Sequence, residues 1–183
     1  MADVKGKKNS STAEEYAESV LDVRRVAKVI KGGRRFGFSA LVAVGDKKGR
    51  VGVALGKGRE VSAAISKALK RAKKNMFEVP LYKTTIPFTI KAKHGASSVL
   101  IRSAAKGTGV IAGGAVRSVM DVLGVKDVLA KSFGSGNPQN VVKATVKALQ
   151  MLKSAKQIAA TRGKKLNEIV STAKTTEEKD AIA

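Results

Sequence analysis

The stretch GRRFGFSALVAVGDKKGRVGVAL, residues 33–55, decides the fold of the first half of the chain. In its first part apolar side chains recur at every second position, at Phe36, Phe38, Ala40, Val42 and Val44. Successive side chains of a strand point to opposite faces, so these five share one face of a predicted strand. Val51, Val53 and Leu55 alternate in the same way after a glycine-flanked loop at residues 45–49. The short connection between the two predicted strands favours an antiparallel sheet.

A third predicted strand, residues 22–31, precedes this stretch and joins it through Gly32 and Gly33, which allow the positive φ angles of a tight turn. A helix is predicted from about Glu60 to Met76, because apolar side chains there recur at helical spacing: Val61, Ala64, Ile65, Ala68, Leu69 and Ala72. We expect this apolar stripe to cover the apolar face of the sheet. Residues 22–84 are therefore predicted to form one α+β domain, a three-stranded antiparallel sheet plus a helix.

The second half, residues 85–165, predicts another domain of strands and helices. Strands are expected at residues 85–93, 98–104 and 125–133, and helices at residues 114–123, 138–152 and 154–162. Asn137 and Pro138 form an N-cap and first-turn pair for the second of these helices. Residues 1–21 are predicted to be a flexible N-terminal arm. Residues 166–183 are predicted to be a C-terminal extension whose end is disordered.

The charge of the chain points to a polyanionic partner. Between residues 23 and 165 there are 31 Lys and Arg against five Asp and Glu, within apolar-rich, patterned sequence. Like charges repel in a compact state, so such a surface predicts binding to nucleic-acid phosphate. The chain has no Cys, so disulfides and thiolate metal sites are excluded. No apolar run suggests a signal peptide or a membrane span, and we expect a soluble, intracellular protein.

The predicted hairpin around residues 28–35 is the first candidate RNA-binding segment. Glycine lets the backbone approach a phosphate closely, and Arg offers a bidentate fork to its oxygens. The candidate residues on and beside this hairpin are Arg24, Arg25, Lys28, Lys31, Gly32, Gly33, Arg34 and Arg35. Since aromatic side chains are scarce, we expect recognition of folded RNA by shape and backbone rather than by base stacking.

Two further places offer cations to phosphate. Lys57 and Arg59 flank Gly58 at the start of the first predicted helix, where free backbone N–H groups favour anions. Lys93 and His94 follow in a basic stretch of the second half. His94 is the sole histidine of the chain, and a phosphate or solvent contact there is favoured over general-base catalysis.

The glycine-rich segment at residues 107–114 satisfies the pattern G-x-G-x-x-A, with Asp127 about 20 residues further on. This pattern raises the alternative of a dinucleotide-binding enzyme. A doubly wound sheet needs more strands than the following sequence offers, so a structural glycine turn is favoured. Acidic residues are too sparse in the patterned region for a carboxylate pair or a hard-metal site, so we expect no enzyme, no metal and no cofactor.

The order of four motifs resembles the family of the fifth protein of the bacterial small ribosomal subunit. These motifs are KGGRRF at residues 31–36, GKGRE at 56–60, GTGVIAGG at 107–114 and GSGNP at 134–138. The resemblance covers roughly residues 22–170. It implies an N-terminal domain like a double-stranded-RNA-binding domain and a C-terminal two-layer α/β domain with a left-handed βαβ crossover.

The resemblance also implies a function and partners. The family binds small-subunit ribosomal RNA in the cytoplasm, stabilises the head of the subunit relative to its body, lines the channel by which messenger RNA enters, and affects translational accuracy. Its implied protein partners are the fourth and eighth small-subunit proteins. Gly107, Gly109 and Arg117 fall in the region that the resemblance links to the fourth protein. A free-standing RNA-binding regulator that uses only the first domain remains an alternative.

Overall fold

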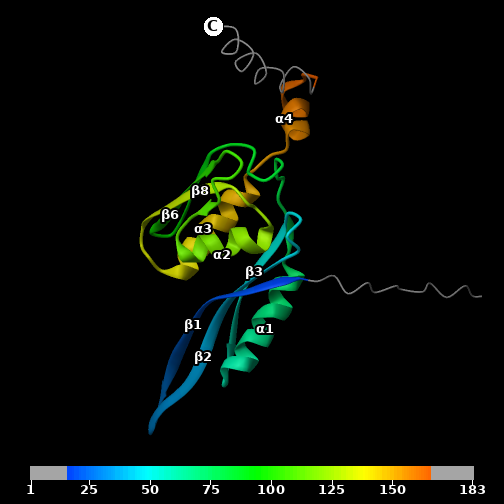
Figure 1. Ribbon diagram of the computed structural model, residues 1–183. Helices are drawn as coiled ribbons and strands as arrows, with labels where there is room; N and C mark the ends of the chain where they lie inside the picture. Colours follow the sequence, from blue (N-terminus) through cyan, green and yellow to red (C-terminus); the bar gives the residue numbers. More distant parts are fainter. Residues whose placement is uncertain (1–15, 166–183) are drawn as a thin grey trace, which may run out of the picture.

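The computed structural model describes residues 16–165; the predicted arm up to residue 15 and the predicted extension 166–183 lie outside the described residues. Within them the chain forms two four-stranded sheets, in the orders β1-β2-β3-β4 and β5-β6-β8-β7, together with four α-helices (Figure 1). The predicted α+β class is therefore confirmed.

The first sheet consists of β1 (Ala17–Ile30), β2 (Gly33–Gly45), β3 (Arg50–Gly58) and the short β4 (Phe77–Glu78), all paired antiparallel. The predicted meander is confirmed, and β4 adds a two-residue edge strand that sequence periodicity cannot reveal. Helix α1 (Val61–Lys74) packs on one face, where Ala64, Ala68 and Ala72 are buried.

The predicted C-terminal boundary of the N-terminal arm, residue 21, was wrong. Strand β1 begins at Ala17 instead of Asp22, because Ala17 pairs with Gly45 while Ala17 and Leu21 pack against the core. The pairing register shifts between Val20 and Asp22, which marks a bulge or irregularity. Such a shift interrupts the alternation of apolar and polar residues by which a strand is recognised in sequence.

The second sheet is built from β5 (Ile90–His94), β6 (Ser97–Ser103), β7 (Val110–Ile111) and β8 (Val128–Gly134). Pairing is antiparallel except between β7 and β8, which are parallel and are connected through α2 (Gly114–Leu123). Strand β5 starts five residues later than predicted, and β8 three residues later. The backbone N–H groups of Lys126 and Asp127 donate to the carbonyl of Thr84, so they bond to the segment before β5 instead of to a neighbouring strand.

The helix after the predicted cap at Asn137 begins where expected, and the last helix begins one residue after its predicted start, Ser154, which caps it. Helix α3 (Pro138–Gln150) starts after Asn137, whose side-chain oxygen accepts from the backbone N–H of Gln139. Helix α4 (Ala155–Arg162) starts with a capping box between Ser154 and Gln157. Both helix starts are thus determined by local sequence.

The two sheets share one hydrophobic core. Leu41, Ala43 and Val51 of the first sheet belong to the same buried cluster as α2, α3 and the second sheet. The alternate positions Ala40, Val42 and Val44 pack against α1 instead. The first sheet is therefore covered on both faces, by α1 on one side and by the second half of the chain on the other (Figure 1).

Candidate nucleic-acid interface

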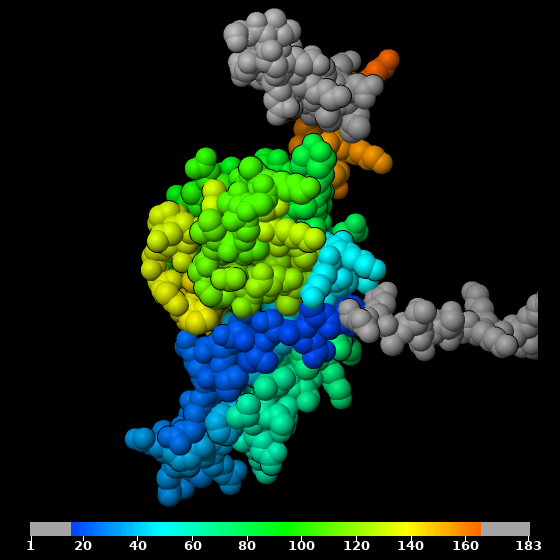
Figure 2. All heavy atoms as spheres, in the orientation of Figure 1, coloured from blue at the N-terminus to red at the C-terminus, as the bar shows by residue number. Residues whose placement is uncertain are grey.

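The hairpin of β1 and β2 extends beyond the rest of the first sheet. Pairing of β2 with β3 ends at Phe38 and Gly58, whereas pairing of β1 with β2 continues to Ile30 and Gly33. Residues 26–37 therefore form a two-stranded ribbon, which we call the β-ribbon. It projects at the end of the molecule opposite α4, as the ribbon and space-filling views show (Figures 1 and 2).

Every residue from 23 to 36 is exposed in this projecting segment. The exposed side chains include large apolar ones, with Val29 at 75% and Phe36 at 55% of full exposure. An isolated two-stranded hairpin is only marginally stable in water. A ribbon of this length and composition is therefore suited to being covered by a partner.

The predicted RNA-binding residues on the β-ribbon occupy both of its faces. Lys28 and Arg35 lie directly opposite each other on one face, which also carries Arg24, while Arg25 and Arg34 lie on the face that packs against α1 further along. Lys31 stands at the tip beside Gly32 and Gly33, whose φ angles are 97° and 146°. The structure thus places six of the eight predicted residues on the β-ribbon and the other two, Arg24 and Arg25, at its base.

Few carboxylates neutralise these cations. Arg24 pairs with Asp22 at 2.6 Å, and the Arg25 guanidinium lies over the Phe36 ring at 4.6 Å. Lys28, Lys31, Arg34 and Arg35 make no ion pair with any residue in the described part of the chain, and each is exposed. Directly opposed like charges destabilise a strand pair, so an anion between Lys28 and Arg35 would stabilise the β-ribbon.

Lys57 extends this basic surface onto β3. The register places Lys57 opposite Ser39, which is in turn opposite Arg24, so the three side chains form a row across one face of the sheet. Arg59 is exposed just before α1, where Glu60 makes no side-chain hydrogen bond to cap the helix. Both predicted residues lie next to the base of the β-ribbon.

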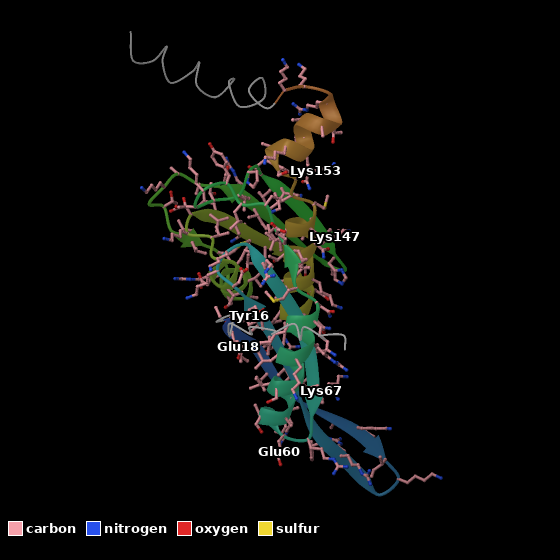
Figure 3. The ribbon with its side chains drawn as sticks, turned by 90° about the vertical axis from the view of Figure 1, so that its right-hand side faces the viewer. Tyr16, Glu18, Glu60, Lys67, Lys147 and Lys153 are labelled. Carbon is pink, nitrogen blue, oxygen red and sulfur yellow. The ribbon has the colours of Figure 1, made fainter. Side chains whose placement is uncertain are left out.

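Lys93 and His94 lie elsewhere, at the end of β5 beside α3. The Lys147 ammonium donates to the carbonyl of Lys93 at 3.5 Å, and Lys147 projects from α3 (Figure 3). His94 is half-buried in a groove between β3 and α3, which Lys143 also lines. Sequence reasoning missed these two lysines, although their spacing of four on the polar side of a predicted helix was a usable signal.

Asp127 holds the glycine-rich turn and is only 3% exposed. Its Oδ1 atom accepts from the backbone N–H of Gly107 at 2.9 Å and of Gly109 at 3.1 Å. The hydroxyl of Thr84 and the N–H of Gly109 lower the pKa of the Asp127 carboxyl, so it stays ionised. This carboxylate is occupied by the turn itself, and the sheet has a single parallel pair, which argues against the dinucleotide alternative.

The three residues predicted to face a protein partner belong to one segment. Gly107 and Gly109 adopt positive φ angles of 93° and 78° in the turn after β6. Arg117 is exposed on α2 and lies 3.9 Å from Asp121. These residues are accessible for contact.

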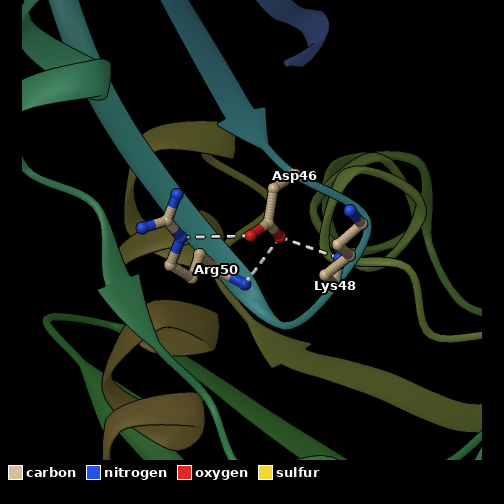
Figure 4. A network of polar contacts seen from close by, with 3 residues as sticks. All are labelled: Asp46, Lys48 and Arg50. Carbon is tan, nitrogen blue, oxygen red and sulfur yellow. Dashed lines mark hydrogen bonds and ion pairs between the residues drawn. The ribbon is translucent and has the colours of Figure 1, made fainter. Parts of the chain in front are cut away.

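Asp46 organises the connection between β2 and β3, a role that sequence reasoning did not assign. Its carboxylate accepts from the backbone N–H groups of Lys48 at 2.7 Å and Arg50 at 2.9 Å, and from the Arg50 guanidinium at 3.1 Å (Figure 4). Partial burial raises the pKa of Asp46, but the hydrogen bonds from Arg50 and Lys48 outweigh it, so the net pKa is lowered. The aspartate followed by a glycine-ended loop was the available signal.

Among residues 16–165, no cluster of three or more His, Cys, Asp or Glu side chains could hold a metal ion. None of the helices described there has the length and hydropathy needed to cross a membrane.

Comparisons with known proteins assign the two halves of the chain to one family. Residues 16–80 match the family model "Ribosomal protein S5, N-terminal domain", and residues 92–162 match "Ribosomal protein S5, C-terminal domain". Small ribosomal subunit protein uS5 of Nitrosococcus oceani is 57% identical over 160 residues, which cover 87% of this chain and 94% of that protein. The Marinobacter nauticus and Coxiella burnetii proteins of the same name are 51% and 53% identical, over 88% and 87% of this chain and 98% and 95% of their own lengths. The chain belongs to the ribosomal protein S5 family.

Proposed function

We propose that this protein is a structural, non-enzymatic constituent of the small ribosomal subunit and binds its ribosomal RNA. Its similarity to proteins named small ribosomal subunit protein uS5 supports this function. The structural observation that carries the proposal is the β-ribbon, on which Lys28 faces Arg35 without a carboxylate between them. Such an arrangement is most stable when phosphate oxygens lie against both side chains.

The proposed RNA surface includes the β-ribbon and the row formed by Arg24, Ser39 and Lys57. These cations would bind folded RNA through its phosphates, and the exposed apolar side chains of the β-ribbon would be buried by the same contact. Arg59, Lys93 and His94 remain proposed contacts on neighbouring surfaces.

Replacement of Lys31, Arg34 and Arg35 by Ala tests this surface. The triple variant should fold normally and lose affinity for small-subunit ribosomal RNA in a filter-binding or fluorescence titration. Unchanged affinity would remove the β-ribbon from the RNA surface. The broader function is tested by gradient sedimentation of native extracts, where absence of the protein from small subunits would contradict it.

We further propose the roles that the family resemblance implies within the subunit. The protein would stabilise the head relative to the body, line the channel by which messenger RNA enters, and contribute to translational accuracy. The segment containing Gly107, Gly109 and Arg117 would contact the fourth small-subunit protein, and the eighth would be a second partner. Charge reversal of Arg117 should then alter misreading in a reporter assay without changing the affinity for RNA alone.

The finer features of the fold are proposals of the same kind. The first domain, residues 22–84 with the added start of β1, would be of the double-stranded-RNA-binding type. The second, residues 85–165, would contain a left-handed crossover in its β7-α2-β8 unit. An experimental structure that places α2 on the other side of the sheet would contradict that handedness.

The alternative of a free-standing regulator makes a different prediction. A regulator that uses only the first domain would keep its function after deletion of the second. Leu41, Ala43 and Val51 are buried in the core shared with the second half, so this deletion would expose an apolar face of the first sheet. We therefore expect the truncated chain to aggregate, which disfavours the alternative.

A further inference from the structure

A groove of about 390 Å³ lies between the two halves of the chain. The floor is aliphatic and comes from the first sheet and from α3: Leu41, Val53, Leu55, Val142 and Val146. One wall is a single stripe of α3, at the helical spacing of three and four residues: Gln139, Val142, Lys143, Val146, Lys147 and Gln150. His94 lines the same groove from the end of β5.

The groove combines three kinds of chemistry. Aliphatic side chains and the imidazole of His94 offer surfaces against which a flat ring can pack. The side chains of Gln139 and Gln150 provide amide donors and acceptors. Lys143 and Lys147 supply positive charge, and no acidic side chain lines this groove. A ligand that fits all three is flat, carries hydrogen-bonding edges and bears a negative charge.

The groove also joins the proposed RNA surface. A smaller hollow, lined by Arg24, its ion-pair partner Asp22, Ser39 and Asn137, shares Leu41, Leu55 and Gln139 with the groove. Arg24 and Ser39 belong to the row that ends at Lys57, next to the β-ribbon. An RNA strand that follows the row from the β-ribbon therefore reaches the groove through a hollow that adjoins it.

We propose that this groove binds one unstacked nucleotide of the RNA. The base lies against His94 and the aliphatic floor, Gln139 and Gln150 face its edge, and Lys143 and Lys147 bind the adjoining phosphates. Unpaired nucleotides splayed out of folded RNA are commonly held by stacking and by amide contacts to the base edge. This inference rests on the proposed function, and it adds a base-binding site to a surface otherwise made for phosphates.

The test compares variants of the full chain in binding to small-subunit ribosomal RNA. His94→Ala removes the stacking surface and should weaken binding by about fivefold or more, with an unchanged salt dependence, because stacking releases no counterions. Lys143→Gln combined with Lys147→Gln should weaken binding and reduce the salt dependence. Lys153→Gln combined with Lys156→Gln, two exposed lysines after α3, is the matched control and should behave like the wild type.

Chemical probing of the base edges provides the second measurement. We expect at least one unpaired base to be protected in the wild-type complex and to become reactive with the His94→Ala variant. Wild-type affinity and unchanged base protection with this variant would overturn the inference. If the variants bind RNA normally but recruit another small-subunit protein less well, the groove holds a protein segment and the inference is equally wrong. Failure of the wild-type chain to bind the RNA would instead refute the proposed function.

Discussion

The backbone N–H of Lys47 donates a hydrogen bond to the carbonyl of Val122 over 3.1 Å, so a loop of the first sheet closes the last turn of α2. The N–H of Gly49 donates to the carbonyl of Leu123 in the same way. Carbonyl groups at a helix C-terminus lack partners within the helix, and here another part of the fold supplies them. The two halves of the chain are thus joined by polar as well as apolar contacts.

Gly124→Ala should destabilise the protein by at least about 2 kcal/mol. Gly124 has a φ of 92°, and a Cβ atom there would lie 2.1 Å from the carbonyl oxygen of Lys47. Gly107 is the matched control, because its φ is 93° but no atom lies within 4 Å of the position that an added Cβ would take. Urea denaturation should show a clearly smaller loss of stability for Gly107→Ala than for Gly124→Ala. Equal losses would mean that the close approach of residue 124 to the Lys47 carbonyl does not affect stability.

Gly56→Ala should cost about 1–3 kcal/mol through overpacking between β3 and α1. An added Cβ atom at Gly56 would lie 2.1 Å from the carbonyl oxygen of Ala64, on the buried side of α1. Thermal and urea denaturation measure the effect. Gly136→Ala is the control, since no atom lies within 4 Å of its added Cβ, and it should leave stability nearly unchanged.

Asp46→Ala should destabilise the protein by about 1–2 kcal/mol at neutral pH, because two backbone N–H groups and Arg50 lose their acceptor. The pKa of Asp46 is lower in the folded state than its ordinary value of 3.8, so the folded protein binds this proton less well than the unfolded chain. The ionised form therefore stabilises the fold above pH 3.8, and this contribution is lost as the pH falls through the folded pKa.

The stability difference between wild type and Asp46→Ala should thus shrink as the pH is lowered below about 4. Denaturation at several pH values checks this, with Asp121→Ala, on an exposed site of α2, as the comparison. A difference that grows in acid would contradict the role of the ionised carboxylate.

Lys28→Glu should have opposite effects on the free protein and on RNA binding. The variant places a carboxylate opposite Arg35, and such a cross-strand pair stabilises a hairpin by about 0.2–1 kcal/mol. Amide hydrogen exchange in the β-ribbon should therefore slow, while affinity for ribosomal RNA falls. Lys153→Glu changes the net charge equally and serves as control. If protection from hydrogen exchange and RNA affinity both decrease, the variant has merely disrupted the β-ribbon.

RNA affinity should depend steeply on salt. If the basic surface neutralises about six to ten phosphates, affinity should fall by about a thousandfold or more between roughly 50 and 200 mM salt. A titration series with the full chain measures the slope, and a flat profile would show that phosphate contacts contribute little.

Sequence periodicity predicted the elements that have a regular apolar pattern. The alternation of Phe38, Ala40 and Val42 indicated β2, and helical spacing indicated α1 within two residues at each end. Strand β7 lacks any such pattern, because only Val110 and Ile111 pair, within a glycine-rich segment held by a distant carboxylate. Its pairing with β8 depends on tertiary contacts that no local window contains.

Part of the candidate site could likewise be predicted from the sequence, and part could not. Cations clustered along one hairpin could be identified from sequence, and register then placed Lys28 against Arg35. The groove could not be predicted, since His94, Leu55 and Lys143 come together only when the two sheets pack. One signal of that packing was present, because residues 40–44 are apolar at every position, which is typical of a strand buried on both faces.

The double covering of the first sheet has a consequence for synthesis of the protein. Strand β2 leaves the translating ribosome about eighty residues before α2 is complete, and at roughly 5–20 residues per second this delay lasts on the order of 4–16 s. During that interval Leu41 and Ala43 have no helix to cover them. The nascent chain thus exposes an apolar sheet face. We expect a chaperone that binds nascent chains to shield this face until the helix is made.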